Sequence, residues 1–383
     1  MCVFLLNIRI VPGYRNSYEL LTGSNRCTYC IPRVPRAYYG LLPIDRAVKA
    51  LFDGTSVRTG SAGRVLYEQS GYGRLDTEGL RLAPQEALYL IHRQKIDVEG
   101  YTFDTLLAEF ADETNFLRTF LVYRDLRERG YVVQTGPHDY RVFRRGEKPG
   151  TGESLYSVRV LSERDPVRFA TLIEEVVAAK NMRKQYVLAV VDDEDELTYY
   201  EIKFQKLAEA CSPALELPVY ESVLIGKSGM VEVPRDSLLE RAGFGKRLDE
   251  NRLILSPVEL LYLMDTGILS LTKNGSPVSR EKYFSAACDA DRELAAKTKV
   301  YTELRRHEFT PRTGYKFGHH FRVYCSKSVH SDMLVHAIEK EAVMPMSVIS
   351  RSVRMAHSVK KKMLFGCVHT TGIQFVEFAR IKL

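Results

Sequence analysis

Three residues toward the C-terminus of this 383-residue chain are able to transfer protons and to stabilise negative charge: Tyr324, His330 and Lys361. An imidazole with an unperturbed pKa of about 6.5 gives or takes a proton near neutrality, and a lysine ammonium is a compact positive charge. A phenol has a pKa of about 10, so nearby cations must lower it before it acts as a base. The three types together predict acid–base chemistry on an anionic substrate.

Each of these residues also has an ordinary structural explanation. A tyrosine at the end of a strand is commonly a half-buried sheet residue. A run of lysines such as residues 360–362 commonly ends a helix, where the helix dipole favours cations. The residue types therefore do not identify a site until the rest of the chain is considered.

The chain contains two copies of one pattern, which is the observation that organises the sequence. In each copy a proline begins an amphipathic helix, a charged helix follows, and alternating strands come after it. The matching segments are 84–91 (PQEALYLI) with 257–264 (PVELLYLM), 122–131 (VYRDLRERGY) with 300–309 (VYTELRRHEF), and 140–143 (YRVF) with 321–324 (FRVY).

These matches predict a duplicated α/β (α+β) protein. We expect repeat one at about residues 46–210, a linker at 211–218 and repeat two at 219–383. Each repeat is expected to have a small N-terminal α/β part and a C-terminal mixed sheet flanked by helices. Residues 1–45 match nothing else in the chain and are an N-terminal extension of unclear structure.

The two repeats differ at the chemically capable positions. Where repeat two has Tyr324 and His330, repeat one has Phe143 and Glu153, while a lysine, Lys184, stands where repeat two has its own lysine. The hydroxyl and the imidazole are therefore missing from repeat one. This pattern predicts an active second copy and a silent first copy.

Three segments of repeat two resemble signature blocks of the archaeal tRNA-splicing endonucleases, also called tRNA-intron lyases. They are residues 314–324 (GYKFGHHFRVY), 330–331 (HS) and 352–363 (SVRMAHSVKKKM). Repeat one resembles the degenerate copy of the two-repeat, homodimeric members. Repeat two departs from the family at Lys360, where arginine is usual, and at His319 and His320, where an acidic or small residue is common.

The resemblance implies that Tyr324, His330 and Lys361 form a catalytic triad on a nuclease-like sheet. Metal-free RNA cleavage needs a base for the 2′-OH, an acid for the departing 5′-oxygen and a cation for the phosphorane. These three side chains supply such groups, and the products would be a 2′,3′-cyclic phosphate and a 5′-OH end. No cofactor and no metal are expected.

The resemblance also implies a substrate and a way of holding it. The substrate would be precursor tRNA with a bulge-helix-bulge at its exon–intron junctions, and a two-fold homodimer would present two identical sites to the two bulges. Arg354 and Arg380 match the arginine pair that sandwiches an unpaired base. Arg322 is expected to assist as a further RNA-binding cation and to lower the tyrosine pKa.

A run of five acidic residues in repeat one has no counterpart in repeat two, where the same turn reads HTTG at 369–372. Family members use an acidic loop of the noncatalytic copy in assembly, so we expect this run to dock on a basic pocket of the partner protomer. Simple solubility is the competing explanation. The residues are Asp192, Asp193, Glu194, Asp195 and Glu196.

Composition is compatible with this interpretation. The net charge of +7 suits a polyanionic partner without establishing one, and 45% hydrophobic with 27% charged residues is ordinary for a globular protein. No apolar run is long enough to span a bilayer and the apolar start lacks a basic leader, so a cytoplasmic protein without membrane contact is expected. Seven cysteines indicate reduced thiols, and neither the lone CxxC of Cys27 and Cys30 nor the pair His319-His320 has further ligands at recognisable spacing.

Two other functions fit parts of the sequence. The first is a noncatalytic RNA-binding or structural subunit, as repeat one would be by itself. The second is a metal-dependent nuclease that uses the acidic run, although the run lies in the repeat that lacks the tyrosine and the histidine.

Overall fold

The computed structural model describes residues 8–9, 19–20, 47–111, 115–207, 216–325 and 330–383. It divides into two compact units, Met1–Arg46 and Ala47–Leu383. In the first unit, β1 (Ile8–Arg9) and β2 (Glu19–Leu20) pair antiparallel. The CxxC motif at Cys27 and Cys30 lies outside the described residues, as does most of the extension and of the linker.

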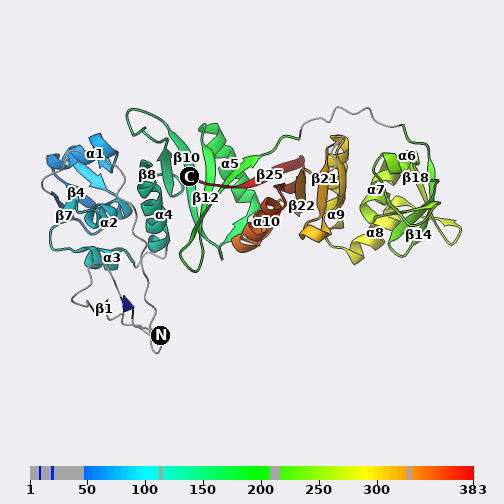
Figure 1. The fold of residues 1–383 in the computed structure, drawn as a ribbon, viewed down its shortest axis with the longest axis horizontal. Coiled ribbons are helices and arrows are strands. Elements are labelled where there is room, and N and C mark those ends of the chain that lie inside the picture. Colours follow the sequence, from blue (N-terminus) through cyan, green and yellow to red (C-terminus); the bar gives the residue numbers. More distant parts are fainter. Residues whose placement is uncertain (1–7, 10–18, 21–46, 112–114, 208–215, 326–329) are drawn as a thin grey trace. The chain divides into compact units, whose positions relative to one another are not determined.

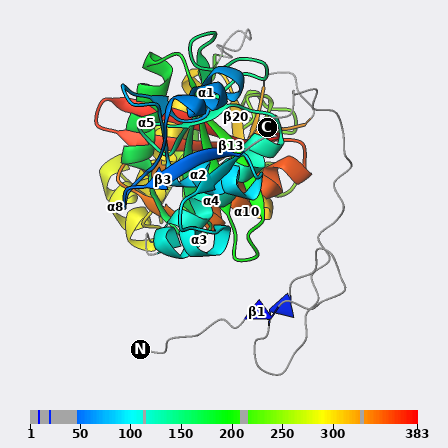
Figure 2. The same ribbon diagram turned by 90° about the vertical axis from the view of Figure 1, so that its left-hand side faces the viewer.

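The second unit contains the duplicated architecture (Figure 1). In repeat one, a five-stranded sheet has the order β5-β6-β4-β3-β7. Figure 2 shows this part of repeat one facing the viewer. The elements are β3 (Val48–Phe52), β4 (Val57–Thr59), α1 (Arg64–Ser70), β5 (Arg74–Leu75), β6 (Leu80–Leu82), α2 (Pro84–His92), β7 (Ile96–Val98), α3 (Phe103–Ala111) and α4 (Phe116–Glu128).

Repeat two begins with the matching arrangement, a six-stranded sheet of order β16-β17-β15-β14-β18-β19. As β3 pairs parallel with β7 in repeat one, β14 pairs parallel with β18 here. The elements are β14 (Tyr220–Ile225), β15 (Ser228–Glu232), α6 (Leu238–Arg241), β16 (Lys246–Arg247), β17 (Arg252–Leu255), α7 (Pro257–Asp265), β18 (Leu269–Lys273), β19 (Ser276–Pro277), α8 (Arg280–Ala290) and α9 (Leu294–Arg306).

The predicted proline-initiated helices are confirmed as α2 and α7. In each, the glutamate at the third helical position accepts the backbone N–H of the residue before the proline, at 2.9 Å for Glu86 and 2.8 Å for Glu259. Each carboxylate also accepts a glycine N–H of the preceding hairpin, Gly73 or Gly245. The shared glutamate therefore fixes both helix starts against their sheets.

The C-terminal parts of the two repeats form one ten-stranded sheet of order β20-β21-β22-β24-β25-β13-β12-β10-β9-β8 (Figure 1). The two halves join where β13 and β25 pair antiparallel, with Ile202 opposite Phe378. The strands are β8 (Val133–Thr135), β9 (Tyr140–Phe143), β10 (Ser154–Ser162), β12 (Gln185–Val191), β13 (Leu197–Phe204), β20 (Thr310–Thr313), β21 (Phe321–Tyr324), β22 (Met333–Glu339), β24 (Lys362–His369) and β25 (Gly372–Ile381).

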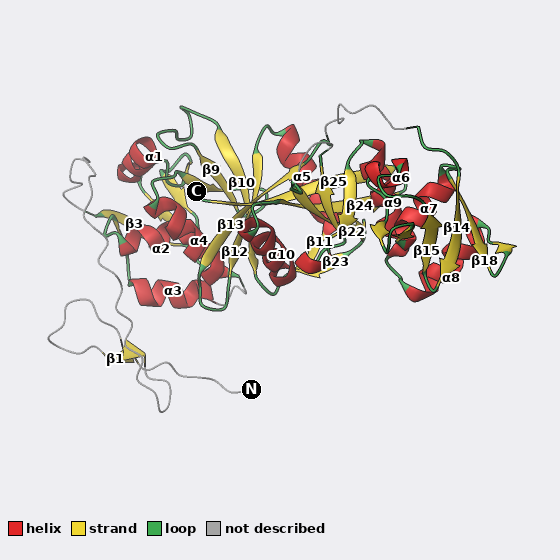
Figure 3. Cartoon of the chain, turned by 45° about the vertical axis from the view of Figure 1, so that its right-hand side comes forward, coloured by secondary structure: helices red, strands yellow, loops and turns green. Residues whose placement is uncertain are grey.

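Helices cover both faces of this sheet. On one face lie α5 (Phe169–Asn181) and α10 (Met346–Ser358), both labelled in Figure 3. Their buried residues form a hydrophobic cluster with the sheet, in which the ring centroids of Phe169 and Phe365 are 5.0 Å apart. On the other face, α4 packs on repeat one, where the hydroxyl of Tyr199 donates to Asp125 at 2.7 Å, and α9 packs on repeat two. A short ribbon of β11 (Pro166–Arg168) and β23 (Val343–Pro345) also links the repeats.

The structure therefore confirms the predicted duplicated α/β fold with mixed sheets flanked by helices. None of the helices in the described part of the chain is both long and apolar enough to cross a membrane.

Candidate active site

Three strand ends of repeat two meet at one edge of the ten-stranded sheet. Tyr324 is the last residue of β21, His330 comes shortly before β22, and Lys361 immediately precedes β24. Strand β21 runs antiparallel to β22, and β22 runs parallel to β24, so the carboxyl end of β21 lies beside the amino ends of the other two. The topology thus brings together the three residues that the sequence singled out.

A hydrogen bond ties the lysine to the histidine segment. The Lys361 ammonium donates to the carbonyl oxygen of Ser331, the residue after His330, at 2.5 Å. The backbone of Lys361 is held by the carbonyl of Ala356 in the last turn of α10, at 2.9 Å. Lys360 has a positive φ of 56°, which turns the chain from the helix into β24. The lysine side chain is therefore held between a helix end and a strand start.

The tyrosine has a cation beside it. The guanidinium carbon of Arg322 lies 5.6 Å from the ring centroid of Tyr324, two residues away on the same face of β21. Tyr324 is half-buried and His330 is exposed, so both side chains are accessible to a large ligand.

Repeat one has the same backbone arrangement without the reactive groups. Phe143 ends β9, Glu153 precedes β10, and Lys184 precedes β12. The Lys184 ammonium donates to the carbonyl oxygen of Ser154 at 3.3 Å, as the lysine of repeat two does to its serine. Arg183 has a φ of 57°, the counterpart of the turn at Lys360.

The two predicted stacking arginines lie on different elements. Arg354 is exposed on α10, and Arg380 is exposed near the end of β25, opposite Tyr200 of β13. Within the described residues, neither guanidinium has a hydrogen-bond or ion-pair partner. Both are therefore available to a ligand.

The acidic run forms the turn between β12 and β13, as the sequence predicted. One carboxylate oxygen of Asp192 accepts the backbone N–H groups of Glu194 and Glu196 at 3.0 and 2.9 Å. Asp193 forms an ion pair with Arg164 of the same chain. Asp192 thus builds the turn, and the other four carboxylates are exposed.

One group of potential metal ligands occurs in the described part of the chain: Glu293, His320 and His336. Folding supplies ligands that His320 lacked in the sequence. Two contacts nevertheless argue against a cation: the N–H of Ala337 donates to Nδ1 of His320 at 3.0 Å, which leaves the proton on Nε2, 3.3 Å from Glu293. The ammonium of Lys297 also lies 3.1 Å from the Glu293 carboxylate.

The histidines of this cluster are neutral. The rings of His320 and His336 stack with centroids 4.0 Å apart, and burial lowers the pKa of each to about 4. His319 is buried beside them, and burial lowers its pKa to about 4 as well. The cluster is therefore a packed contact between β21, β22 and the start of α9.

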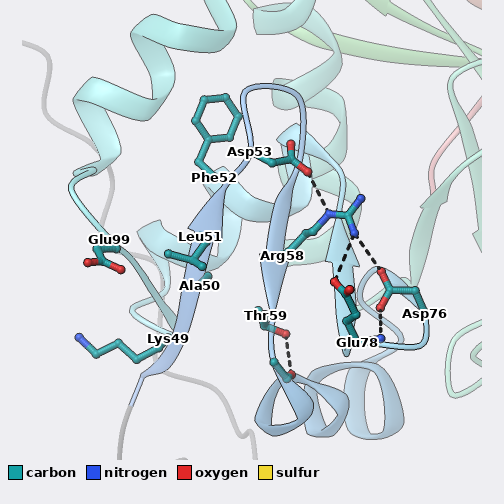
Figure 4. Close-up of a pocket in the computed structure, with 11 residues that line it drawn as sticks. Lys49, Ala50, Leu51, Phe52, Asp53, Arg58, Thr59, Asp76, Glu78 and Glu99 are labelled. Carbon is teal, nitrogen blue, oxygen red and sulfur yellow. Dashed lines mark hydrogen bonds and ion pairs between the residues drawn. The ribbon is translucent and has the colours of Figure 1, made fainter.

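A cavity of about 930 Å³ lies elsewhere, on β3 and β4 of repeat one (Figure 4). Arg58 is neutralised there by Asp53, at 2.9 Å, and by Asp76, at 3.6 Å. Among the described residues that line this cavity there is no histidine, cysteine or tyrosine. It has none of the predicted site residues and no arrangement for acid–base chemistry.

One residue at the site, Asp332, was not predicted from the sequence. Asp332, directly after the serine that the lysine contacts, accepts a hydrogen bond from the backbone N–H that follows Tyr324. The available signal was the difference from repeat one, which has Leu155 at this position.

Comparison with known proteins matches both halves of each repeat. The tRNA intron endonuclease N-terminal domain matches residues 48–107 and 220–284, and the tRNA intron endonuclease catalytic C-terminal domain matches residues 116–199 and 294–375. The chain is 35% identical to a tRNA-splicing endonuclease of Methanococcoides burtonii over 334 residues, which cover 83% of this chain and 94% of that protein.

Two further relatives agree. A tRNA-splicing endonuclease of Methanosarcina acetivorans is 36% identical over 88% of this chain and 100% of its own length, and one of Natronomonas pharaonis is 35% identical over 86% and 98%. The matches extend through both repeats and include the strand ends where Tyr324, His330 and Lys361 meet. This chain therefore belongs to the tRNA intron endonuclease family.

Proposed function

We propose that the chain is a tRNA-splicing endonuclease that cleaves precursor tRNA at bulge-helix-bulge exon–intron junctions by metal-independent attack of a 2′-OH. The observation that carries this proposal is the contrast between the repeats. In both repeats the lysine donates to the backbone carbonyl at the start of a strand, and repeat two alone has a tyrosine and a histidine at the neighbouring strand ends. The products would carry a 2′,3′-cyclic phosphate and a 5′-OH.

In this proposal each side chain has a distinct task. His330 protonates the departing 5′-oxygen, because an imidazole holds a transferable proton near neutral pH. Lys361 stabilises the phosphorane: one of its three N–H groups is used on Ser331, and the others remain for phosphate oxygens. Tyr324 removes the 2′-OH proton, assisted by the nearby guanidinium of Arg322.

We further propose that Arg354 and Arg380 hold the RNA. Planar guanidinium groups stack on unpaired bases and bind phosphates, and both groups are exposed without internal partners in the described structure. Arg322 adds positive charge at the strand end. In this proposal the two guanidinium groups stack on an unpaired base of the bulge.

The working assembly in this proposal is a homodimer in which the acidic turn docks on a basic pocket of the partner. Four of its five carboxylates are exposed, and the fifth, Asp192, already has its hydrogen bonds within the turn. A two-fold dimer would repeat the contact and present two active sites to the two bulges.

The test is incubation with an intron-containing precursor tRNA in excess EDTA, followed by analysis of the fragment ends. The proposal predicts cleavage at both junctions with cyclic phosphate and 5′-OH ends. Loss of cleavage on chelation, with recovery on adding Mg²⁺, would instead indicate a metal-dependent nuclease. A protein that binds the RNA without cutting it would indicate a noncatalytic subunit.

A further inference from the structure

Asp332 connects all three strand ends at the candidate site. Its carboxylate accepts the backbone N–H of Cys325, the residue directly after Tyr324, at 3.1 Å. Its own N–H donates to the carbonyl of Val323 at 2.9 Å, and its carbonyl accepts the N–H of Lys362 at 3.2 Å. One residue thus holds the end of β21, the start of β22 and the start of β24.

Of these three hydrogen bonds, only the one made by the side chain depends on the residue type at position 332. The two backbone bonds continue the strand ladders, and any residue would make them. The bond from the N–H of Cys325 needs an acceptor in the side chain of Asp332, and it holds the backbone immediately after Tyr324. Partial burial raises the pKa of the Cys325 thiol, and the neighbouring Asp332 carboxylate raises it further.

Repeat one provides an internal comparison. The residue matching Asp332 is Leu155, which has no acceptor. There the pairing of β9 with β10 slips: Ser154 lies opposite Phe143 and Tyr156 opposite Val142, so Leu155 is bulged out of the ladder. In repeat two the ladder ends at the corresponding pair, Val323 with Met333, and Asp332 directly precedes β22. The repeat that has lost the hydroxyl and the imidazole also lacks this carboxylate.

We infer that Asp332 is a positioning residue for the reaction, whose carboxylate fixes the backbone directly after Tyr324. The inference rests on the proposed function, since it concerns the same site. Asp332 does not need to touch the RNA. It acts by tying Cys325, next to Tyr324, to the strand start that follows His330, so that the phenol and the imidazole hold one spacing across the scissile phosphate. A displacement of about 1 Å at reacting groups lowers rates by about a hundredfold.

The test compares Asp332→Leu, which reproduces the residue of repeat one, with Asp332→Asn, which keeps an oxygen acceptor. Single-turnover cleavage of precursor tRNA in EDTA is measured alongside RNA affinity and melting temperature. Asp289→Leu, at an exposed position on α8, is the matched control for loss of an aspartate. Hydrogen exchange of the Cys325 amide reports directly on the contact.

Asp332→Leu is expected to lower the cleavage rate between about tenfold and a hundredfold with RNA affinity nearly unchanged, and to speed exchange of the Cys325 amide. Asp332→Asn is expected to stay within about threefold of the parent, because its amide oxygen accepts the same N–H. If Asp332→Leu does not fold, Asp332→Ala takes its place.

Parental cleavage by the folded leucine or alanine variant would overturn the inference, as would an asparagine variant as slow as the leucine variant. A loss of melting temperature with an unchanged cleavage rate would also overturn it, because the residue would then be structural alone. If the parental protein does not cleave precursor tRNA, the proposed function fails instead, and the two failures are distinguishable.

Discussion

The ammonium of Lys361 lies 2.5 Å from the carbonyl oxygen of Ser331, the residue next to His330. Because Lys184 makes the same bond to Ser154 in repeat one, the lysine position belongs to the shared scaffold of both repeats. The difference between them lies in what surrounds that lysine. Repeat two adds a phenol, an imidazole and a positioning carboxylate, and repeat one has Phe143, Glu153 and Leu155.

The two lysines are expected to respond differently to mutation. Lys361→Ala should lower the rate of RNA cleavage by about a hundredfold, since it removes the cation assigned to the phosphorane. Lys184→Ala removes the same hydrogen bond from repeat one and should leave the chemical step unchanged. Single-turnover rates of both folded variants provide the measurement. A loss of turnover in a folded, dimeric Lys184→Ala protein would mean that repeat one is not silent.

The two exposed arginines should affect cleavage more than folding. Replacing Arg354 or Arg380 with alanine is expected to impair cleavage of a bulged substrate by about tenfold or more, with little change in melting temperature, because no internal partner is lost. Lysine at the same positions should restore little of the cleavage rate, because an ammonium group cannot stack on a base. If the melting temperature falls while cleavage does not, the arginines are structural.

The acidic turn needs a variant that leaves the turn itself intact. Asp192 is kept because it accepts two backbone N–H groups of the turn, and Asp195 is kept because its φ of 62° favours aspartate over lysine. Lysine replaces Asp193, Glu194 and Glu196, which are exposed. The prediction is dissociation to monomers by light scattering at physiological salt, with loss of cleavage. The contact must be partly desolvated to matter, since exposed ion pairs contribute little. A fully active dimer would show that the turn is a solvated surface.

The buried histidines predict a loss of stability on acidification. Burial lowers the pKa of His320 and of His336 from 6.5 to about 4, so the unfolded chain binds more protons between these values. Their contribution to the free energy of unfolding is therefore fully present above pH 6.5 and is lost as the pH falls toward 4. Three charged groups face the stacked histidines: Glu293, Asp291 and Lys297. The two carboxylates raise the pKa of His320, and the ammonium lowers it.

Denaturant unfolding at several pH values between 4 and 7 measures this dependence. His336→Gln should show a shallower fall than the parent across that range, because one titrating group is removed. Identical slopes for the two proteins would contradict the assignment of a lowered pKa to His336.

Much of this arrangement follows from local patterns in the sequence. The proline starts of α2 and α7, the acidic turn and the strands that end at Phe143 and Tyr324 are set by residues close together in the chain. These features could be predicted because turn chemistry and periodicity are local.

Features that depend on pairing between distant segments could not be predicted. The continuous sheet requires β13 to pair with β25, and nothing in either strand specifies that partner. The approach of Glu293 and His336 to His320 likewise depends on the packing of α9 against β22. The role of Asp332 depends on strand register, because a shift of one residue would turn its side chain to the other face.

The central claim is that chemistry takes place in repeat two, where Tyr324, His330 and Lys361 meet. Single-turnover cleavage of precursor tRNA by His330→Ala tests it most directly, with His357→Ala, an exposed histidine on α10, as control. The account predicts a loss of roughly a hundredfold or more for His330→Ala with RNA affinity nearly intact, and a parental rate for the control. Cleavage by folded His330→Ala at the parental rate would contradict it.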